Sequence, residues 1–318
     1  MKEEFAVKPK LGEPWDVAII GSGPSSFTAA IYTTRGAAST LVLAGEKWGG
    51  QLMLTTTVDN YPGFPEGVQG PDLMSAMRKQ AQRFGAEVVE KNVTAVDFAG
   101  KPFKLTAGGK EYLAKSIIIA TGAETNWLGI PGEDRLRGRG VSSCAPCDAP
   151  FFKNKNVAVI GGGDSAMEEA LVLTKYATKV TIIHRRDAFK ASKAMQSKVM
   201  GQVQAGKVEI VWDSEVVGFL GEATLEKIRI KNTKTSEVGD RAFEGAFVAI
   251  GHNPSTEIFR GKVDLDEKGY AKAFDHTKTN VEGVFIAGDV HDTHYRQAVT
   301  AAGFGCMAGM EVLKYLDK

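Results

Sequence analysis

Hydrophobic residues in this chain gather in short runs, and two of these runs are followed by the same kind of glycine-rich turn. The first run, at 17–20, leads into Gly-Ser-Gly-Pro-Ser-Ser at 21–26. Apolar residues then recur at helical spacing through about Arg35, and another apolar run follows at 40–43. The order strand, glycine turn, helix and strand predicts a βαβ nucleotide-binding unit.

The same layout returns in the middle of the chain. A run at 157–160 leads into Gly-Gly-Gly-Asp-Ser-Ala at 161–166, a helical pattern to about Tyr176 and a strand at 180–183. In each copy the first glycine permits a tight turn, and the second lets backbone N–H groups approach a pyrophosphate at the positive end of the helix. One such motif is weak evidence, but two copies in one chain favour nucleotide binding over ordinary glycine turns. Ser26 replaces the third glycine or alanine of the motif in the first copy, and a serine is small enough to allow close packing of the helix.

Later segments extend the repetition. Each unit is followed by an apolar strand that ends in glycine, at 117–122 and at 246–251, and a third such signal stands at 284–289. Short alternating segments at 87–98 and 227–232 predict antiparallel strands.

The pattern as a whole predicts an α/β fold with two Rossmann-like dinucleotide-binding domains of the three-layer ββα type, one inserted into the other. The outer domain would comprise 1–121 and 250–318, and the inner domain 122–249.

Charge and hydropathy narrow the class of protein. Lys plus Arg number 39 and Asp plus Glu 38, so there is no electrostatic case for binding nucleic acid or an anionic membrane. Residues 1–5 carry charges where a secretory signal needs an apolar core. No apolar run approaches the roughly 20 residues that span a bilayer. These features favour the cytoplasm, where thiols stay reduced.

The three cysteines are the main candidates for chemistry. Cys144 and Cys147 form a CxxC motif just before the second glycine loop, and Cys306 stands far away. Three cysteines are too few for a four-thiolate metal site, and His291 and His294 show no metal-ligand spacing, so no metal is expected. The pair instead indicates a disulfide that is made and broken during turnover. Cys306 is expected to be a buried small apolar residue.

The residues after the second strand of each unit indicate which nucleotide it prefers. Glu46 stands 25 positions after Gly21 and could accept hydrogen bonds from an unphosphorylated ribose, although a surface glutamate is common there. The same offset from Gly161 reaches Arg186, with His184 and Arg185 beside it. Such a cluster suits a 2′-phosphate and therefore NADPH, the alternative being a solvated basic strand end.

With these residues in place, the chain resembles the low-molecular-weight thioredoxin reductase family over nearly its whole length. The motifs that carry the resemblance are, in order, GSGPSS at 21–26, GGQL at 49–52, the TTT…DNYPGFPEG region through 67, ATG at 120–122, CAPCD at 144–148, GGGDSA at 161–166, HRRD at 184–187, GHNP at 251–254, AGD at 287–289 and YRQA at 295–298.

The resemblance implies that the outer domain holds FAD and the inner domain NADPH. The implied FAD residues are Gly21, Gly23, Pro24, Ser25, Glu46, Gly50, Gln51, Asn60, Thr121, Gly122, Gly288, Asp289, Arg296, Gln297 and Ala298. Among them Asp289 would hold the ribityl chain. The last helix would begin at Arg296, Gln297 and Ala298, with its positive end facing the flavin. Read without the family, Gly288 and Asp289 are a turn and Arg296 a surface charge. The implied NADPH residues are Gly161, Gly163, Asp164, Ser165, His184, Arg185, Arg186, Lys190, Ile250 and Gly251.

The implied activity is that of an NADPH-dependent thioredoxin-disulfide reductase. Electrons would pass from NADPH through FAD to the Cys144–Cys147 disulfide and then to thioredoxin or a thioredoxin-like protein. Cys147 would face the flavin, Cys144 would attack the partner, and Asp148 would move the proton, unless Asp148 is only a helix N-cap. The resemblance also implies a homodimer, and a rotation of the inner domain about hinges near 122–123 and 250–251.

Two departures from the family pattern concern the donor and the partner. Lys190 stands where the family usually has a third arginine. A lysine can pair with a phosphate as a point charge, but it lacks the two parallel hydrogen bonds that an arginine can donate. Pro150 alters the segment after Asp148, where Phe151 and Phe152 could dock a partner or belong to the core. Alternatives are a disulfide reductase with another donor or partner (ferredoxin, a glutaredoxin-like protein or a peroxidase system), an NADP–ferredoxin reductase of the same fold, and a non-catalytic FAD-binding subunit.

Overall fold

A computed structural model describes residues 7–55 and 57–318 of the chain. By its internal contacts the chain divides into two compact units, Met1–Glu124 with Asn253–Lys318 and Thr125–His252. The charged segment at 1–5, which argued against a secretory signal, lies outside the described residues. Within the described part of the chain, no helix is both long and apolar enough to cross a membrane.

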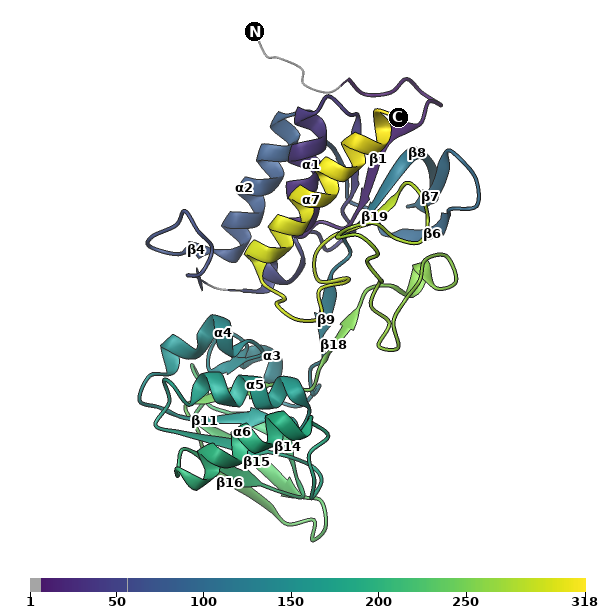
Figure 1. Cartoon of the computed structure of the whole chain (residues 1–318). Coiled ribbons are helices and arrows are strands. Elements are labelled where there is room, and N and C mark those ends of the chain that lie inside the picture. Colours follow the sequence, from purple (N-terminus) through teal and green to yellow (C-terminus); the bar gives the residue numbers. More distant parts are fainter. Residues whose placement is uncertain (1–6, 56) are drawn as a thin grey trace. The chain divides into compact units, whose positions relative to one another are not determined.

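The first unit is built on one large sheet (Figure 1). Its strands run in the order β5-β2-β1-β8-β7-β6, and β19 also pairs with β8. Their bounds are β1 Trp15–Ile20, β2 Thr40–Leu43, β5 Glu87–Val89, β6 Val93–Asp97, β7 Phe103–Ala107, β8 Lys110–Ile119 and β19 Val284–Ile286. The strands β5, β2, β1, β8 and β19 are parallel, and β6 and β7 form an antiparallel extension.

One strand direction differs from the expectation. The segment 87–98 was expected to be antiparallel throughout, but only β6 is, while β5 runs parallel to β2 with Glu87 opposite Leu41. The reason is the preceding helix α2 (Gly70–Arg83), which carries the chain back along the sheet before β5 begins. Alternating hydrophobicity gives the exposed face of a strand and not its direction.

Alternating residues of β1 separate two cores and make the unit three-layered. Val17 and Ile19 pack with helices α1 (Pro24–Arg35), α2 and α7 (Ala298–Leu316), whereas Ala18 and Ile20 pack with the antiparallel strands on the other face. Helices α1 and α7 lie very close, since a Cβ on Gly305 would stand 2.2 Å from the Ser25 carbonyl oxygen.

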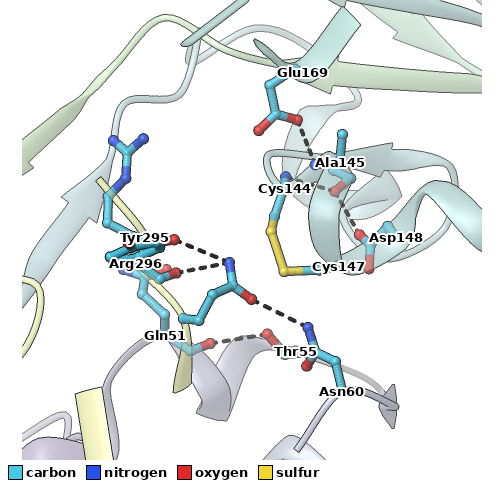
Figure 2. Close-up of a disulfide and its surroundings, with 12 residues drawn as sticks. Gln51, Thr55, Asn60, Cys144, Ala145, Cys147, Asp148, Glu169, Tyr295 and Arg296 are labelled. Atoms are coloured by element: carbon cyan, nitrogen blue, oxygen red, sulfur yellow. Dashed lines mark hydrogen bonds between the residues drawn. A yellow bond between two sulfur atoms is a disulfide. The ribbon is translucent and has the colours of Figure 1, made fainter. Parts of the chain in front are cut away.

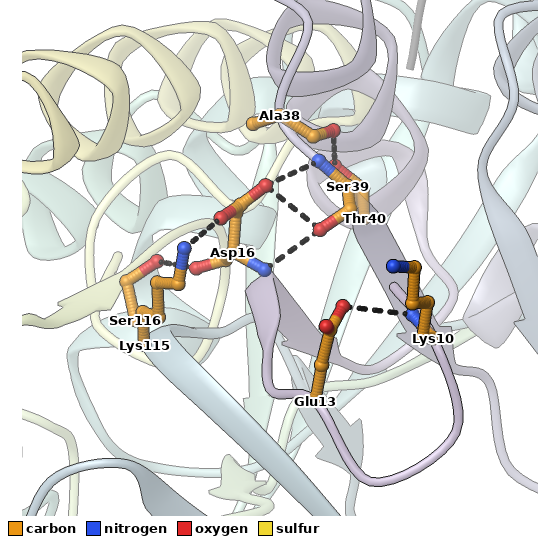
Figure 3. A network of polar contacts seen from close by, with 8 residues as sticks. All are labelled: Lys10, Glu13, Asp16, Ala38, Ser39, Thr40, Lys115 and Ser116. Atoms are coloured by element: carbon orange, nitrogen blue, oxygen red, sulfur yellow. Dashed lines mark hydrogen bonds and ion pairs between the residues drawn. The ribbon is translucent and has the colours of Figure 1, made fainter. Parts of the chain in front are cut away.

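A polar network at the start of β1 joins three neighbouring strands (Figure 3). The Asp16 carboxylate accepts hydrogen bonds from the Ser39 amide and hydroxyl and from Lys115, and its carbonyl accepts one from Ser116. Burial opposes the ionisation of Asp16, but the hydrogen bonds from Lys115 and Ser39 outweigh it and hold its pKa below the ordinary value. The network fixes the register of β1 between its neighbours.

The second unit repeats the plan on a smaller scale. Its parallel sheet has the order β10-β17-β11-β12-β13, and a separate antiparallel sheet has the order β14-β15-β16. Helices α5 (Asp164–Leu173) and α6 (Lys193–Gln204) cover one face of the parallel sheet, and the antiparallel sheet covers the other. The strands are β10 Val141–Ser142, β11 Asn156–Ile160, β12 Lys179–Ile183, β13 Val208–Val211, β14 Ser214–Leu220, β15 Lys227–Asn232, β16 Val238–Ala242 and β17 Gly245–Val248.

These two sheets confirm the predicted α/β fold with two dinucleotide-binding plans, and β15 confirms the antiparallel strand predicted at 227–232. Helix α5 ends at Leu173 rather than near Tyr176. The Thr174 hydroxyl bonds the Leu171 carbonyl at 2.7 Å, and a threonine that bonds the helix backbone in this way favours a helix end over its continuation.

Shorter elements complete the chain. Strands β9 (Ala123–Thr125) and β18 (His252–Pro254) pair with each other where the chain passes between the units, and the adjacent Gly122 and Gly251 have φ of 71° and 106°. The remaining elements are η1 Gly50–Leu54, β3 Thr57–Val58, β4 Val68–Gln69, α3 Glu133–Leu136, α4 Ala145–Asp148, η2 Ala149–Phe152 and η3 Glu257–Phe259.

Candidate active site

The first glycine loop leaves an open backbone at the start of α1. Gly21 has φ of 125°, and a Cβ there would lie 2.1 Å from the Ala120 carbonyl oxygen, so only glycine fits. Gly23 precedes the helix, and no heavy atom lies within 4 Å of the position of its missing Cβ. Pro24 and Ser25 form the first turn, which contains no acidic residue. The positive end of α1 therefore faces a space that an anion can enter.

Ser22, which the sequence analysis did not single out, joins this loop to a second predicted FAD segment. Its buried hydroxyl donates to the Ala44 carbonyl at 2.7 Å and accepts the Gly49 N–H at 2.9 Å. The same contacts bring Gly50 beside the loop, since its missing Cβ would lie 3.7 Å from the Gly23 Cα. The only sequence signal was a small polar residue between two glycines.

Asp289 is a buried carboxyl group, and one of its oxygens lacks a hydrogen-bond partner among the described residues. This oxygen, Oδ1, lies inside the unit. Burial, and then the charge of Asp292, raises its pKa to about 6. The preceding Gly288 has φ of 81° and packs against Ser25 of the glycine loop. An orphaned buried acceptor close to an open helix end fits a ligand that brings both hydroxyl groups and phosphate, as FAD does.

The start of α7 brings together residues far apart in the sequence. Gln297 is the N-cap and shares a reciprocal capping box with Thr300, so the helix begins at Ala298. The Gln297 side chain also accepts a hydrogen bond from the Asn60 side-chain amide at 3.2 Å. Three predicted residues therefore meet at one helix end.

The contacts and exposure of the other predicted FAD residues give less specific evidence for a ligand. Glu46 is exposed and lies 3.5 Å from Lys91 in an ion pair. The Thr121 hydroxyl donates to the Ser255 carbonyl, next to Gly122. Gln51 lies exposed in η1.

The second glycine loop repeats the first in its backbone. Gly161 has φ of 153°, and its missing Cβ would lie 2.3 Å from the Ala249 carbonyl oxygen, in the strand-end segment that continues to Ile250 and Gly251. Gly163 has nothing within 4 Å. Helix α5 starts with Asp164, whose carboxylate accepts the Ser192 N–H at the start of α6, and continues with Ser165.

The predicted basic cluster divides into one buried and three exposed members. His184 is buried, its ring lies against Gly162, and its Nε2 is 3.0 Å from the Ala188 carbonyl oxygen. Burial lowers its pKa, which favours the neutral ring. Arg185, Arg186 and Lys190 are exposed, and the Lys190 N–H bonds the Gly162 carbonyl at 2.8 Å. Three fixed cations thus lie on a segment tied to the glycine loop.

Cys144 and Cys147 are joined in a disulfide at the start of the one-turn helix α4, with Cα atoms 5.3 Å apart (Figure 2). Both cysteines are half-buried. Glu169 of α5, which the sequence analysis did not name, accepts the Ala145 N–H at 2.5 Å. The backbone that carries the disulfide is therefore anchored to the helix that follows the second glycine loop.

Asp148 is held beside Cys144 by a residue that the sequence analysis missed. The Ser142 hydroxyl donates to Asp148 Oδ2 at 2.6 Å and accepts the Cys144 N–H at 3.1 Å. The alternative role of Asp148 as a helix N-cap is not realised, because its side chain makes no capping bond to η2. The motif contains two serines, 142 and 143, and only the fold distinguishes them.

Two further expectations are resolved by burial. Phe152 packs in the core with its ring 5.1 Å from that of Phe247, whereas Phe151 is 52% exposed. Cys306 is half-buried in α7 rather than buried, because its thiol meets the Tyr32 hydroxyl and the Met310 sulfur near the surface.

Comparisons with known proteins agree with this geometry. Residues 15–305 match the family described as pyridine nucleotide-disulphide oxidoreductase. The chain is 50% identical to a thioredoxin reductase of Streptomyces coelicolor over 95% of this chain and 94% of that protein. It is 49% identical to one of Rickettsia prowazekii over 95% of this chain and 98% of that protein.

Solved structures give the same result. A thioredoxin reductase from Streptococcus pyogenes matches with a TM-score of 0.90 at 39% identity, covering 95% of this chain and 98% of that one. One from Lactococcus lactis matches with a TM-score of 0.63 at 41% identity, covering 95% and 99%. This chain, with its redox-active Cys144–Cys147 disulfide, belongs to the thioredoxin reductases of the pyridine nucleotide-disulphide oxidoreductase family.

Proposed function

We propose that this enzyme uses NADPH, through bound FAD, to reduce its Cys144–Cys147 disulfide, and that the resulting dithiol reduces the disulfide of thioredoxin. The observation that carries the proposal is the disulfide itself, with the carboxylate of Asp148 tied by Ser142 to the backbone of Cys144. A structural staple does not need a carboxylate tied to the backbone of one of its cysteines, whereas a disulfide that opens and closes needs a proton carrier.

The unit formed by 1–124 and 253–318 would hold FAD. Supporting features are the open Gly23, the acid-free start of α1 and the orphaned Oδ1 of Asp289. An anionic pyrophosphate suits the helix end, and a ribityl hydroxyl group suits the unanswered carboxyl oxygen. Gln297 and Ala298 would present the positive end of α7 to the flavin.

The unit formed by 125–252 would hold NADPH. Arg185, Arg186 and Lys190 are exposed on the segment that folds against Gly162. A 2′-phosphate would meet two guanidinium groups there, with Lys190 as an additional point charge. By contrast, Glu46 at the corresponding strand end of the other unit would repel a phosphate.

When bound, FAD would supply the relay that accepts a hydride from NADPH and delivers the electron pair to the disulfide. We assign the delivery to Cys147. The S–S bond then breaks, and Cys144 leaves as a thiolate that takes a proton from Asp148. In the second half, Asp148 takes that proton back and Cys144 attacks the partner's disulfide, and the partner thiolate that leaves takes the proton from Asp148. Cys147, as a thiolate, attacks the Cys144 sulfur to close the internal disulfide, and the second partner thiolate leaves and takes a proton from water.

The exposed ring of Phe151 would provide an aromatic contact for the partner beside Cys144. The relatives' name, thioredoxin reductase, makes thioredoxin the first partner to test. A glutaredoxin-like protein or a peroxidase system would use the same dithiol chemistry.

The nicotinamide of NADPH and the disulfide would lie on one unit, and each would have to reach the flavin in turn, so that unit would have to rotate. The connections carry glycines with positive φ at 122 and 251, close to the proposed hinges at 122–123 and 250–251. Two relatives of nearly equal identity to this chain match it with TM-scores of 0.90 and 0.63, which indicates that family members differ in the arrangement of their parts. The family resemblance also implies a homodimer, which light scattering would test.

An anaerobic titration with NADPH tests the proposal. Wild type and Cys147→Ser should both show bleaching of the flavin absorbance, but only wild type should reduce thioredoxin. Cys306→Ser is the matched control and should behave as wild type in both assays. Absence of bleaching with NADPH would reject the donor, and bleaching without thioredoxin reduction by wild type would reject the partner.

A further inference from the structure

We propose that Asp292 is a positioning residue for the cofactor-facing end of α7. Its buried carboxylate holds the turn at 294–296, so that the helix begins at the position from which it can meet FAD. The inference rests on the proposed FAD site and adds a residue that does not itself touch the cofactor.

The first observation is the set of bonds that Asp292 makes. Its side chain is buried, with 6% exposure. Oδ1 accepts the backbone N–H groups of His294 at 2.9 Å and Tyr295 at 2.8 Å, and Oδ2 accepts that of Arg296 at 3.0 Å. Three backbone N–H groups bonded to one carboxylate are a strong, charge-assisted arrangement.

The second observation is the conformation of the residue that these bonds reach last. Arg296 has φ of 50°, in the left-handed region that a non-glycine residue enters only when its surroundings impose it. The bond from its N–H to Asp292 Oδ2 supplies such a constraint. Arg296 directly precedes the N-cap Gln297, so its backbone conformation sets where α7 starts and where Gln297 meets Asn60.

The third observation is the contrast with the neighbouring carboxyl group. Asp289 Oδ1 has no partner among the described residues, and burial followed by the charge of Asp292 raises its pKa. The two acids, three positions apart, therefore have different roles. Asp292 is saturated by the protein backbone, whereas Asp289 keeps an oxygen for a ligand.

The test compares Asp292→Asn and Asp292→Ala with a matched control. Asparagine keeps the acceptor for His294 and Tyr295 but places an N–H group against that of Arg296. Asp266→Asn is the control, because Asp266 Oδ1 likewise accepts two backbone N–H groups, from Lys268 and Tyr270, in a turn of the same unit.

The measurements are the dissociation constant for FAD on reconstitution of the FAD-free protein, the visible spectrum of the bound flavin and the thermal unfolding midpoint. We expect the dissociation constant to rise about tenfold in Asp292→Asn and about a hundredfold in Asp292→Ala, with a shifted flavin spectrum in both. Asp266→Asn should keep the wild-type constant and spectrum.

Wild-type affinity and spectrum in both Asp292 variants would overturn the inference. A lower unfolding midpoint with an unchanged flavin spectrum would also overturn it, because Asp292 would then stabilise the loop without positioning α7 for the cofactor. Wild type that binds no FAD would instead reject the proposed function itself. The asparagine variant has the same shape as aspartate, so it decides the question even if the alanine variant does not fold.

Discussion

The two glycine loops of this chain have nearly the same backbone but different surroundings. Gly21 and Gly161 both take positive φ, and in both a Cβ would strike a carbonyl oxygen of a neighbouring strand-end segment, at 2.1 and 2.3 Å. Gly23 and Gly163 both precede a helix and face open space. The loop is therefore a general device for a pyrophosphate and does not by itself select a nucleotide.

The differences begin one residue after each loop. Pro24 starts α1 without an acidic residue in its first turn, whereas α5 starts with Asp164, which is bonded to the start of α6. After the second strand, Glu46 pairs with Lys91 in one unit, and Arg186 stands exposed in the other. The two units are therefore distinguished by the residues around each loop and not by the loop backbone.

The largest effect should come from adding a methyl group to either first glycine. Gly21→Ala should leave a protein that does not retain FAD, whereas Gly161→Ala should retain FAD but lose bleaching by NADPH by at least about 100-fold. Flavin content and anaerobic NADPH titration measure the two outcomes. The controls Gly100→Ala and Gly239→Ala, where a Cβ meets nothing within 4 Å, should be neutral. Equal loss of FAD in both loop variants would refute the division of roles.

The next largest effect concerns Asp289, the buried carboxyl group beside the first glycine loop. Its raised pKa means that the folded protein binds the extra proton, so its contribution to stability falls as pH rises from about 4 through about 6. In the FAD-free protein, Asp289→Asn should therefore raise the free energy of unfolding at pH 7.5 by on the order of 3 kcal/mol.

The gain from Asp289→Asn should vanish only below about pH 3, where the wild-type carboxyl is protonated in both the folded and the unfolded state. Denaturant unfolding at the two pH values checks it, and the same variant should bind FAD more weakly. Asp16→Asn is the opposite control, because its pKa is lowered and its loss should destabilise the protein at neutral pH. A destabilised Asp289→Asn at pH 7.5 would contradict the prediction.

A smaller effect should separate the two strand ends. Arg186→Ala should raise the dissociation constant for NADPH about tenfold and leave that for NADH within about twofold, because a single charged contact to the 2′-phosphate is lost. Calorimetric titration of both nucleotides measures the ratio. Arg229→Ala removes an exposed arginine paired with Asp240 in the same unit and should change neither constant. An equal loss for both nucleotides would show that Arg186 does not read the phosphate.

The smallest effect concerns the redox motif, which only the second unit carries. Ser142→Ala removes the link between Asp148 and the Cys144 backbone and should slow the dithiol's reduction of thioredoxin about fivefold. Stopped-flow mixing of the reduced enzyme with oxidised thioredoxin measures this step. Ser143→Ala is the matched control, and if both serine variants slow the reaction equally, the specific role of Ser142 is excluded.

Much of this molecule could be predicted because its signals are local. The strands at 17–20 and 157–160, the glycine turns and the helices after them depend on nearest-neighbour patterns, and the CxxC pair depends on a spacing of three. The direction of β5, the end of α5 and the exposure of Cys306 were predicted wrongly. Each depends on which element lies beside the residue in space, and a one-dimensional pattern does not contain that.

The site shows the same division. By itself the sequence determined two nucleotide loops, a dithiol and a basic strand end, because glycine, cysteine and arginine in such patterns have few other uses. Only the tertiary structure decided which serine holds Asp148, which phenylalanine is exposed, and which of two nearby aspartates is saturated by backbone N–H groups. Hydrogen bonding and burial are relations between segments distant in the chain, and folding alone brings those segments together.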